Sequence, residues 1–498
     1  MTQDRPARLS TGIEGLDYVL RGGFPPGHLY LVQGHPGVGK TTLALQFLLE
    51  GVQRGEPGLY ITLSESRKEL EEIARSHGWS LDQLTLFELT ALQKSQAAED
   101  QSILDPSEVE LGEAMAPLLA EVERTNPVRV VFDSLSEIRL LAQHALRYRR
   151  QILALKQYFA GRKSTVLLLD DLTSPDQDLQ LQSLAHGVVA LESSQPEYGA
   201  ARRRVFIQKL RGVQFRSGKH DYDIVPGGVR VYPRLVAAEE SRNPNREILS
   251  CGLPKLDLLL GGGLRNGKSL LVTGPSGSGK SLLATQFAMQ AAKRGDASVI
   301  FEFDENADTF LERSAGVGMD LQKHVKSGLI SLQQIDPAEL TPGEFAFRVR
   351  FAIEKQQARL VIIDSLTGYL QAMIDQRHLT LHLHELLSYL AQRGIITIAT
   401  VAQSGMMGET MANSAELSFL ADQVVTLRFF ECFGEIRQAI SVPKNRTSAQ
   451  ERSIREFRIG KGGFQIGEPL KEFQGVLRGV PTYSGKASKL LQKKKRKP

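Results

Sequence analysis

Residues 34–41 read GHPGVGKT and residues 274–281 read GPSGSGKS, and these two stretches decide the fold. Both fit the pattern GxxxxGK[ST]; each follows an apolar run typical of a buried strand and precedes a stretch typical of a helix. Glycines let backbone N–H groups turn inward around phosphates, while the positive end of the next helix faces them. The chain is therefore predicted to contain two nucleotide-binding α/β folds.

The two loops belong to a longer internal repeat. The stretch STGIEGLDYVLRGGFPPGHLYLVQGHPGVGKTTLALQF begins at Ser10, and SCGLPKLDLLLGGGLRNGKSLLVTGPSGSGKSLLATQF begins at Ser250, so they align without a gap at an offset of 240 residues. Landmarks further on recur at nearly the same spacing: Asp133 and Asp364 are 231 residues apart. The chain therefore contains a duplicated domain.

The repeat also predicts the domain organisation, and the length of 498 residues agrees with two separately cored units. We expect one domain over residues 1–240, a second over residues 241–480, and a basic, disordered tail over residues 481–498. The polar segment AAEESRNPNRE, residues 237–247, is the expected linker. In each half, four short apolar runs alternate with helical stretches, which predicts a mainly parallel sheet with helices on both faces.

Composition excludes several other classes of protein. With 41% hydrophobic and 23% charged residues, the chain is ordinarily globular. Two cysteines, Cys251 and Cys432, cannot make a disulfide framework or a four-ligand zinc site, and they suit a reducing compartment. No apolar run approaches the roughly 18 residues that a membrane span needs, and the N-terminus lacks the apolar stretch of a secretory signal. We expect a cytoplasmic protein with no membrane contact.

The formal net charge of +5 comes from the C-terminus. The last thirteen residues, KASKLLQKKKRKP, hold seven Lys and Arg and no acid, which leaves 54 basic against 56 acidic residues elsewhere. One interpretation is a solvated end; the other is a docking arm for an anionic partner such as nucleic acid. No dense basic stripe interleaved with aromatic residues accompanies the tail, so nucleic acid is not favoured as a partner.

The two loops predict sites for ATP and Mg²⁺. Lys40 and Lys280 would neutralise oxygens of the β and γ phosphates, while Thr41 and Ser281 would offer a hydroxyl to Mg²⁺. The alternative is two glycine-rich turns with no ligand. Further nucleotide contacts are expected from the loops and the first turn of each helix: Gly34, Pro36, Gly37, Val38, Gly39 and Thr42, then Gly274, Ser276, Gly277, Ser278, Gly279 and Leu282.

An apolar run that ends in an aspartate occurs in each half. Val-Val-Phe-Asp ends at Asp133 and Val-Ile-Ile-Asp ends at Asp364, and each is followed by Ser-Leu. A buried strand beside the phosphate loop normally supplies the carboxylate for Mg²⁺. We therefore predict metal-site roles for both aspartates. The alternative, an aspartate that caps the next helix, is weakened because both halves place the same residue there.

Hydrolysis also needs a group that activates or positions water. The strand after each phosphate-loop helix ends in Leu-Ser-Glu-Ser or Phe-Asp-Glu-Asn, which matches Glu65 with Glu305. Ser64 stands where the second half has Asp304, so adjacent carboxylates occur only in the second half. We predict catalytic roles for Glu65, Asp304 and Glu305; the alternative is an exposed glutamate that starts the next helix.

Basic residues close each half in a K-x-R pattern after an alternating strand. These are Lys209-Leu210-Arg211 and Lys444-Asn445-Arg446. A single copy would suggest an exposed edge with two solvated charges. Because the pattern is repeated, we interpret Lys209, Arg211, Lys444 and Arg446 as residues that complete an active site.

Together these motifs resemble the KaiC family within the RecA-like P-loop ATPases. The lead-in with paired glycines, the phosphate loop, the strand ending in a carboxylate, the Asp-Ser-Leu strand and the K-x-R end are all repeated, and the resemblance covers about residues 8–485. It implies two RecA-like domains in an ATP-dependent hexameric double ring with nucleotides at subunit interfaces. The K-x-R residues would then act in trans on the adjacent subunit's phosphates.

The resemblance also assigns individual residues. It implies a nucleotide contact for Ser76 in the first domain, and Val317 stands where the family has an aromatic residue near the base. The family's second domain can phosphorylate its own adjacent Ser and Thr; Ser418 falls on the phosphoserine and Phe419 on the phosphothreonine. A benzyl group cannot accept a phosphoryl group. A two-site phosphorylation cycle is therefore not expected, and Ser418 is the candidate acceptor.

Three functions fit these predictions. The favoured one is an ATP-hydrolysing signalling switch whose turnover, with or without serine autophosphorylation, is read by an unidentified partner protein. The alternative is a RecA-like DNA-dependent ATPase or nucleic-acid motor, which only the basic tail supports. A third is a structural scaffold that assembles with ATP and does not hydrolyse it.

Overall fold

The computed structural model divides the chain into two compact units, Met1–Arg234 and Leu235–Pro498. It describes residues 7–88, 106–142, 144–172, 181–237, 247–371, 376–403, 418–432, 434–446, 451–476 and 482–483. Most of the expected linker, residues 238–246, and the basic end, residues 484–498, lie outside the described residues. Within the described part, no helix is both long and apolar enough to cross a membrane.

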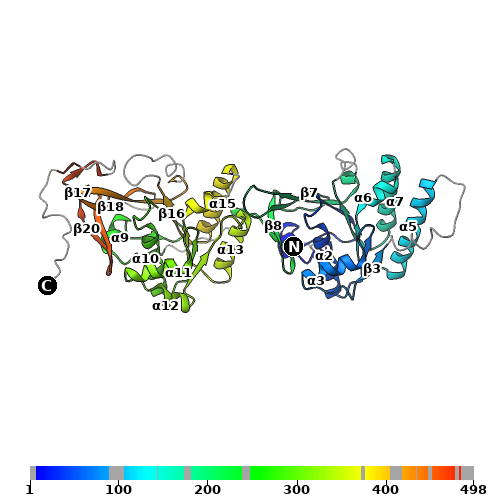
Figure 1. The fold of residues 1–498 in the computed structure, drawn as a ribbon, viewed down its shortest axis with the longest axis horizontal. Coiled ribbons are helices and arrows are strands. Elements are labelled where there is room, and N and C mark those ends of the chain that lie inside the picture. The colour runs from blue at the N-terminus through cyan, green and yellow to red at the C-terminus, as the bar shows by residue number, and fades with distance from the viewer. Residues whose placement is uncertain are drawn as a thin grey trace, which may run out of the picture. The chain divides into compact units, whose positions relative to one another are not determined.

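The first unit is built on a nine-stranded sheet in the order β3-β2-β4-β5-β1-β6-β7-β8-β9 (Figure 1). From β3 to β6 all neighbours are parallel, and β7, β8 and β9 add antiparallel strands. The four predicted apolar runs are confirmed as β1, β2, β4 and β5. The bounds are β1 Leu29–Gln33, β2 Gly58–Thr62, β3 Thr85–Glu88, β4 Arg129–Asp133, β5 Thr165–Asp170, β6 Gly187–Ser194, β7 Arg202–Leu210, β8 His220–Val225 and β9 Gly228–Tyr232.

Helices cover both faces of this sheet (Figure 1). One face carries α1 (Glu14–Val19), α2 (Lys40–Gln53) and α3 (Arg67–Ser76); the other carries α5 (Pro106–Thr125), α6 (Leu135–Ala142) and α7 (Ala145–Ala160). Neighbouring residues of one strand enter different cores: Tyr30 and Val32 pack with α2, whereas Leu29 and Leu31 pack with α7. Burial on both faces explains why the strands read as continuous apolar runs.

The second unit repeats this architecture, with a nine-stranded sheet in the order β14-β13-β15-β16-β12-β17-β18-β19-β20. Its strands are β12 Ser269–Gly274, β13 Ser298–Glu302, β14 Ile330–Gln334, β15 Leu360–Asp364, β16 Ile396–Ala402, β17 Gln423–Cys432, β18 Glu435–Asn445, β19 Arg455–Gly460 and β20 Gly463–Pro469. Two short pairs, β10 Ile248–Leu249 with β11 Leu264–Arg265 and β21 Phe473–Gln474 with β22 Thr482–Tyr483, lie outside it.

Helices again occupy both faces of the second sheet. One face carries α9 (Pro254–Leu259), α10 (Lys280–Lys293), α11 (Ala307–Gly316) and α12 (Leu321–Lys326); the other carries α13 (Pro342–Glu354), α14 (Leu366–Gln371) and α15 (Gln376–Gln392). The predicted fold class, two α/β domains each with a mainly parallel sheet between helices, is confirmed.

Each sheet has two edges that differ in chemistry. The parallel strands β1, β2, β4 and β5 all end at one edge, which we call the phosphate edge because the GxxxxGK[ST] loop leaves β1 there. The strands begin at the other edge, which we call the opposite edge. Because β7 runs antiparallel to β6, the end of β7 lies at the opposite edge.

Candidate nucleotide sites

The two GxxxxGK[ST] loops connect β1 to α2 and β12 to α10. Gly39 and Gly279 stand directly before the helices with φ of 94° and 96°, a left-handed conformation that residues with a Cβ rarely adopt. A Cβ on Gly39 would lie 2.6 Å from Ile224 Cδ1, and Ile459 crowds Gly279 in the same way. Backbone conformation and packing both require glycine, and the curled loop presents its N–H groups to an anion.

The other predicted nucleotide contacts lie in these loops or in the first helical turn. The Tyr222 hydroxyl on β8 donates to the Val38 carbonyl at 2.6 Å and holds the first loop. Ser278 Oγ in the second loop is buried with no hydrogen-bond partner among the described residues. A buried hydroxyl without a partner fits a site that an anion completes. Buried here are Gly34, Thr42, Gly274 and Leu282; exposed are Pro36, Gly37, Ser276 and Gly277.

The lysine of each loop is buried at the start of its helix. Lys40 Nζ donates to the Gly34 carbonyl at 2.7 Å and forms an ion pair with Asp171 Oδ1 at 2.8 Å. Lys280 Nζ donates to the Pro275 carbonyl at 2.9 Å, and burial lowers the pKa of Lys280. Both ammonium groups are held at the phosphate edge, but among the described residues only Lys40 forms a direct ion pair; Asp364 and Asp304 act on Lys280 from a greater distance.

The predicted metal-site residues also meet at the phosphate edge. The Thr41 hydroxyl donates to Asp133 Oδ2 at 2.9 Å. Asp364 Oδ2 is buried and has no hydrogen-bond partner in the described part of the chain. Burial raises the pKa of both aspartates, and the Ser281 hydroxyl counteracts that shift at Asp364. Each site thus places a hydroxyl beside a buried carboxylate, and in the second unit one oxygen of that carboxylate has no hydrogen-bond partner among the described residues. Hydroxyl and carboxylate oxygens are the ligands that Mg²⁺ takes in a P-loop site.

The side chains that fix these aspartates were missed by sequence reasoning. The Tyr60 hydroxyl on β2 donates to Asp133 Oδ2, whereas the Thr400 hydroxyl on β16 donates to Asp364 Oδ1. The peptide bond after each aspartate is cis. The repeat carries no signal for these supports because they come from different strands in the two units.

Glu65 follows β2 at the phosphate edge of the first unit. Its Oε2 atom is buried with no hydrogen-bond partner among the residues described, and burial together with the Asp133 carboxylate raises the pKa of Glu65 to about 7. The Thr62 hydroxyl donates to the Glu65 carbonyl at 2.6 Å and accepts from the Glu65 N–H at 3.0 Å. These bonds fix the backbone of Glu65, and a carboxylate with a pKa near neutrality can accept a proton from water.

Glu305 occupies the matching place in the second unit with different neighbours. It forms an ion pair with Arg313 of α11; burial raises the pKa of Glu305 and Arg313 counteracts the shift. Glu302, which sequence reasoning missed, accepts hydrogen bonds from the N–H groups of Asp304 at 3.1 Å and Glu305 at 3.2 Å. Burial raises the pKa of Glu302 to about 8. Thr62 stands at this position in the first unit, so the supporting group is a hydroxyl there and a carboxyl in the second unit.

The K-x-R residues lie at the opposite edge, away from the phosphate loop of their own unit. The strands run on through the lysines: Lys209 is the last but one residue of β7 and pairs with Val188 near the start of β6. Val188 pairs with Leu31 of β1, two residues or roughly 7 Å before that strand ends. Arg211 lies two residues further from the loop, roughly 13 Å from the end of β1. Neither Lys209 nor Arg211 is brought to its own loop.

Carbonyl groups hold these basic side chains. Lys209 Nζ donates to the Gln182 carbonyl at 2.6 Å, and Arg211 Nη2 donates to the Ser183 carbonyl at 2.8 Å. Each cation is therefore placed by its own unit on the surface of the opposite edge.

In the second unit the same edge carries the candidate phosphoacceptor. Lys444 Nζ donates to the carbonyls of Ser418 at 2.5 Å and Ala421 at 2.7 Å, while Arg446 is exposed just after β18. Phe419 is also exposed. Residues 404–417, which precede Ser418 in the segment that resembles the family's phosphorylation region, lie outside the described residues. The structure brings Ser418 beside Lys444, at the edge opposite to its own phosphate loop.

Two residues named by the resemblance stand at the end of the helix that follows each predicted catalytic glutamate: Ser76, a predicted nucleotide contact, and Val317, at the family's aromatic position. Ser76 ends α3 and is exposed, and its hydroxyl donates to the Ile73 carbonyl at 2.7 Å. Val317 follows α11 and packs, partly buried, against the core beside α10. The contacts that the structure describes for these two residues are with the last turn of α3 and with the hydrophobic core.

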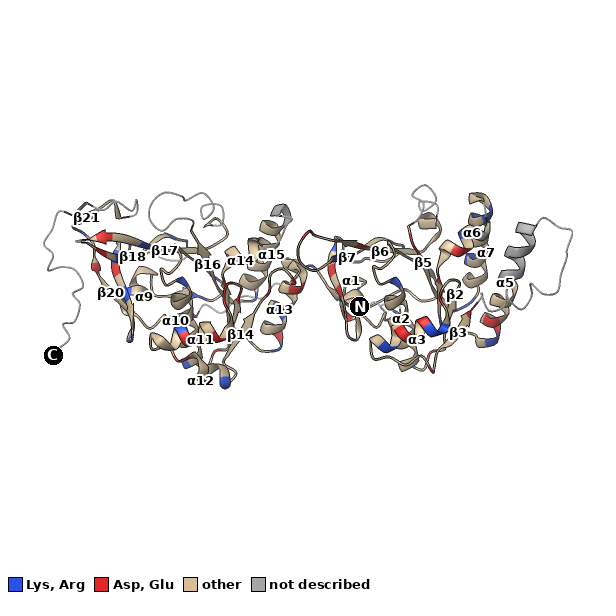
Figure 2. Cartoon of the chain, in the orientation of Figure 1, with Lys and Arg blue, Asp and Glu red and all other residues tan. Residues whose placement is uncertain are grey.

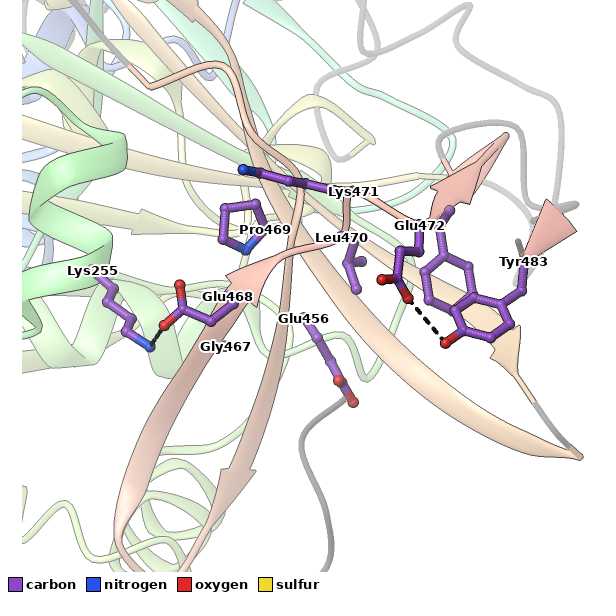
Figure 3. A pocket seen from close by; sticks show the side chains of 10 residues that line it. Lys255, Glu456, Gly467, Glu468, Pro469, Leu470, Lys471, Glu472 and Tyr483 are labelled. Carbon is purple, nitrogen blue, oxygen red and sulfur yellow. Dashed lines mark hydrogen bonds and ion pairs between the residues drawn. The ribbon is translucent and has the colours of Figure 1, made fainter. Parts of the chain in front are cut away.

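A separate pocket of about 600 Å³ lies beside the β21–β22 pair (Figure 3). Its charged side chains contact one another: Lys255 Nζ lies 2.6 Å from Glu468 Oε1, and the Tyr483 hydroxyl donates to Glu472 Oε2 at 3.1 Å. None of its lining residues belongs to a phosphate loop or to the end of β15, so this pocket is not part of the nucleotide site.

Comparison with known proteins agrees with this geometry. The model of the KaiC ATPase family matches residues 9–236 and again residues 249–471. The chain is 27% identical over 486 residues to the circadian clock protein KaiC3 of Synechocystis sp.. The matched residues cover 96% of this chain and 95% of that protein. It is 27% identical over 481 residues to the circadian clock oscillator protein KaiC of Picosynechococcus sp. (95% and 92% covered) and 26% identical over 482 residues to that of Synechococcus elongatus (96% and 92% covered).

Proposed function

Because this chain belongs to the KaiC family of ATPases, we propose that it binds and hydrolyses ATP with Mg²⁺ at two sites, one in each unit. One observation carries the proposal. In each unit a phosphate-loop lysine, a strand-end aspartate beside a hydroxyl residue and a partly buried glutamate gather at one edge of a parallel sheet. These are the groups that phosphoryl transfer to water requires.

In this mechanism the loop residues bind and orient the nucleotide. Lys40 holds the β and γ phosphates, and Thr41 with Asp133 holds Mg²⁺. The metal, when bound, offsets negative charge on the phosphate oxygens. Tyr60 is a positioning residue, because it acts on the nucleotide only through Asp133. The matching loop lysine, hydroxyl residue and strand-end aspartate do the same in the second unit, where a different side chain, Thr400, positions the aspartate.

Glu65 and Glu305 would receive the proton of the attacking water. The bond from the water oxygen to the γ phosphorus forms while the bond to the β-bridging oxygen breaks, so ADP and phosphate leave. The pKa of about 7 suits Glu65 to this task, because a base near the ambient pH is both ionised and able to hold a proton. Asp304 supplies a second carboxylate near Glu305 that the first unit lacks at Ser64.

We further propose that the subunits assemble as a hexameric double ring. Lys209 and Arg211 lie at the edge opposite to their own phosphate loop, so within one subunit they cannot offset charge that develops on the transferred phosphoryl. A neighbouring copy that presents its opposite edge to this loop completes the site. A head-to-tail contact of this kind, repeated with a rotation that closes, gives a ring.

Single and double loop variants test the two-site ATPase. Lys40→Ala and Lys280→Ala should each remove the phosphate release of one unit, and the double variant should release none, because the phosphates lose their charged partner. Phosphate release is measured on the full chain, together with ATP retention by equilibrium dialysis. Phosphate release by the double variant at the rate of the unmodified protein would contradict the proposal, and ATP binding without release by the unmodified protein would indicate a scaffold.

We propose Ser418 as an autophosphorylation site served by an adjacent subunit. Lys444, which we place in the neighbour's nucleotide site, binds the Ser418 carbonyl, so the serine would reach the same γ phosphate. The Ser418 oxygen forms a bond to the γ phosphorus, the bond to the β-bridging oxygen breaks, ADP leaves, and the proton passes to Glu305 of that subunit.

Labelling with [γ-³²P]ATP tests this step. Label should accumulate on the unmodified protein and be lost in Ser418→Ala and in Glu305→Gln. The control Ser414→Ala removes a hydroxyl four residues earlier in the sequence and should keep the label. Free phosphate without any label on the protein would leave an ATPase switch and no kinase.

The proposed role for these activities is a signalling switch read by a partner protein. Figure 2 shows basic and acidic residues interspersed along the elements of each unit, so the described part offers little support for a nucleic-acid motor. Stimulation of phosphate release by DNA would favour the motor instead.

A further inference from the structure

Asp171 stands beside the phosphate-loop lysine of the first unit and has no role in the mechanism above. It directly follows β5, the strand next to β1, and its Oδ1 atom lies 2.8 Å from Lys40 Nζ. The Ser136 hydroxyl donates to Asp171 Oδ2 at 2.9 Å. Although burial opposes the shift, Lys40 and Ser136 hold the pKa of Asp171 below its ordinary value. An ionised carboxylate is thus fixed against the ammonium group that must bind phosphate.

The second unit lacks this carboxylate. Strand pairing matches Asp171 with Ala402: Asp170 pairs with Gln33 in one sheet, and Ala402 pairs with the phosphate-loop residue Gly274 in the other. The Ala402 N–H donates to the Thr367 hydroxyl at 3.0 Å, where the first unit has the bond from Ser136. Among the described residues, Lys280 has no ion-pair partner within 4.0 Å; the Asp364 and Asp304 carboxylates favour its charged form only from beyond that distance, whereas Asp171 is in contact with Lys40.

We propose that Asp171 is an affinity-determining residue of the first nucleotide site: it is the internal counter-ion of Lys40, which the γ phosphate of ATP must displace. This inference rests on the proposed ATP binding at Lys40. The carboxylate and the γ phosphate compete for one ammonium group, and the displaced carboxylate remains near a phosphate of the same charge. ADP lacks the γ phosphate, so Asp171 opposes ATP more than ADP. The first site therefore binds ATP more weakly, relative to ADP, than the second.

The test removes the charge at one site and installs it at the other. In a Lys280→Ala background, where only the first site binds, Asp171→Asn keeps the shape of the side chain and should tighten ATP binding about tenfold, or about 1.4 kcal/mol, with a smaller change for ADP. In a Lys40→Ala background, Ala402→Asp should weaken ATP binding at the second site by a similar factor. Equilibrium dialysis with labelled ATP and ADP on the full chain measures both.

Asp82→Asn is the matched control, because Asp82 also accepts a hydrogen bond from a serine, Ser80 at 2.6 Å, at an exposed position. It should leave both affinities unchanged. Unchanged or weaker ATP binding in Asp171→Asn would overturn the inference, as would slower phosphate release at unchanged affinity, which would make Asp171 a catalytic carboxylate. No ATP binding in the Lys280→Ala parent would instead mean that the proposed function of the first site itself fails.

Discussion

Replacing Arg211 or Arg446 by alanine is expected to lower phosphate release at the corresponding ring of sites by about 10³-fold, the effect of losing a basic group that stabilises phosphoryl transfer from a neighbour. ATP affinity should fall much less, because the loop residues of the other subunit are intact. Phosphate release and equilibrium dialysis on the same preparation separate the two effects. Lys219→Ala is the control, because Lys219 is an exposed cation that pairs with Glu192 at 2.5 Å and has no proposed role in a site.

Mixing variants decides whether the arginine acts in trans. A subunit with Lys40→Ala keeps Arg211, and a subunit with Arg211→Ala keeps Lys40, so a mixed ring contains interfaces with both residues. Activity should return at about one interface in four if the subunits mix at random. The measurement is made with the second sites silenced by Lys280→Ala in every subunit. If the mixture stays as inactive as its components, Arg211 does not complete a neighbour's site.

The second large effect is expected at the glutamates. Glu65→Gln should slow phosphate release at the first site by about 10²–10⁴-fold, the usual contribution of a general base. Bound ATP should persist, because glutamine fills the same space and removes no phosphate contact. Glu305→Gln should act likewise at the second site. Single-turnover phosphate release after ATP loading measures both, and Glu72→Gln, an exposed glutamate paired with Lys68 at 3.9 Å, is the control.

The pH dependence distinguishes a base from a structural carboxylate. The pKa of Glu65 is raised to about 7, so the group is protonated below that pH and ionised above it. A base must be ionised to accept a proton, and turnover at the first site should therefore rise as pH increases through about 7. Glu65→Gln should remove this rise in turnover with pH. If the variant still shows the rise, a group other than Glu65 is responsible for the titration.

The sequence was sufficient to predict features that depend only on neighbouring residues. The glycine before each helix is required by its left-handed backbone, and a continuous apolar run is required in a strand covered on both faces. The loops, four of the nine strands in each sheet and the fold class could therefore be predicted. The repeat showed each of these patterns twice, once in each half. Functional residues that lie in one segment, such as the lysine and the hydroxyl residue of each GxxxxGK[ST] motif, could be predicted for the same reason.

The sequence was insufficient to predict contacts between side chains of different strands. Tyr60 and Thr400 both hold a strand-end aspartate, yet they come from different strands, and nothing in the aligned halves marks them. Glu302 reads as one more residue of a strand, and only its burial below the Asp304 and Glu305 N–H groups gives it a role. Adjacency across a sheet depends on strand order, which residue spacing does not contain.

The sequence by itself therefore determined that this chain is a duplicated α/β ATPase with two phosphate loops, because backbone conformation and burial act on neighbouring residues. Only the tertiary structure decided which side chains face one another. It set Asp171 against Lys40 in one unit and left Ala402 at the matching place in the other. It also placed Lys209 and Ser418 at the edge opposite to the phosphate loops. The physical reason is the order and direction of the strands, which bring distant segments to one edge of a sheet and send others to the opposite edge.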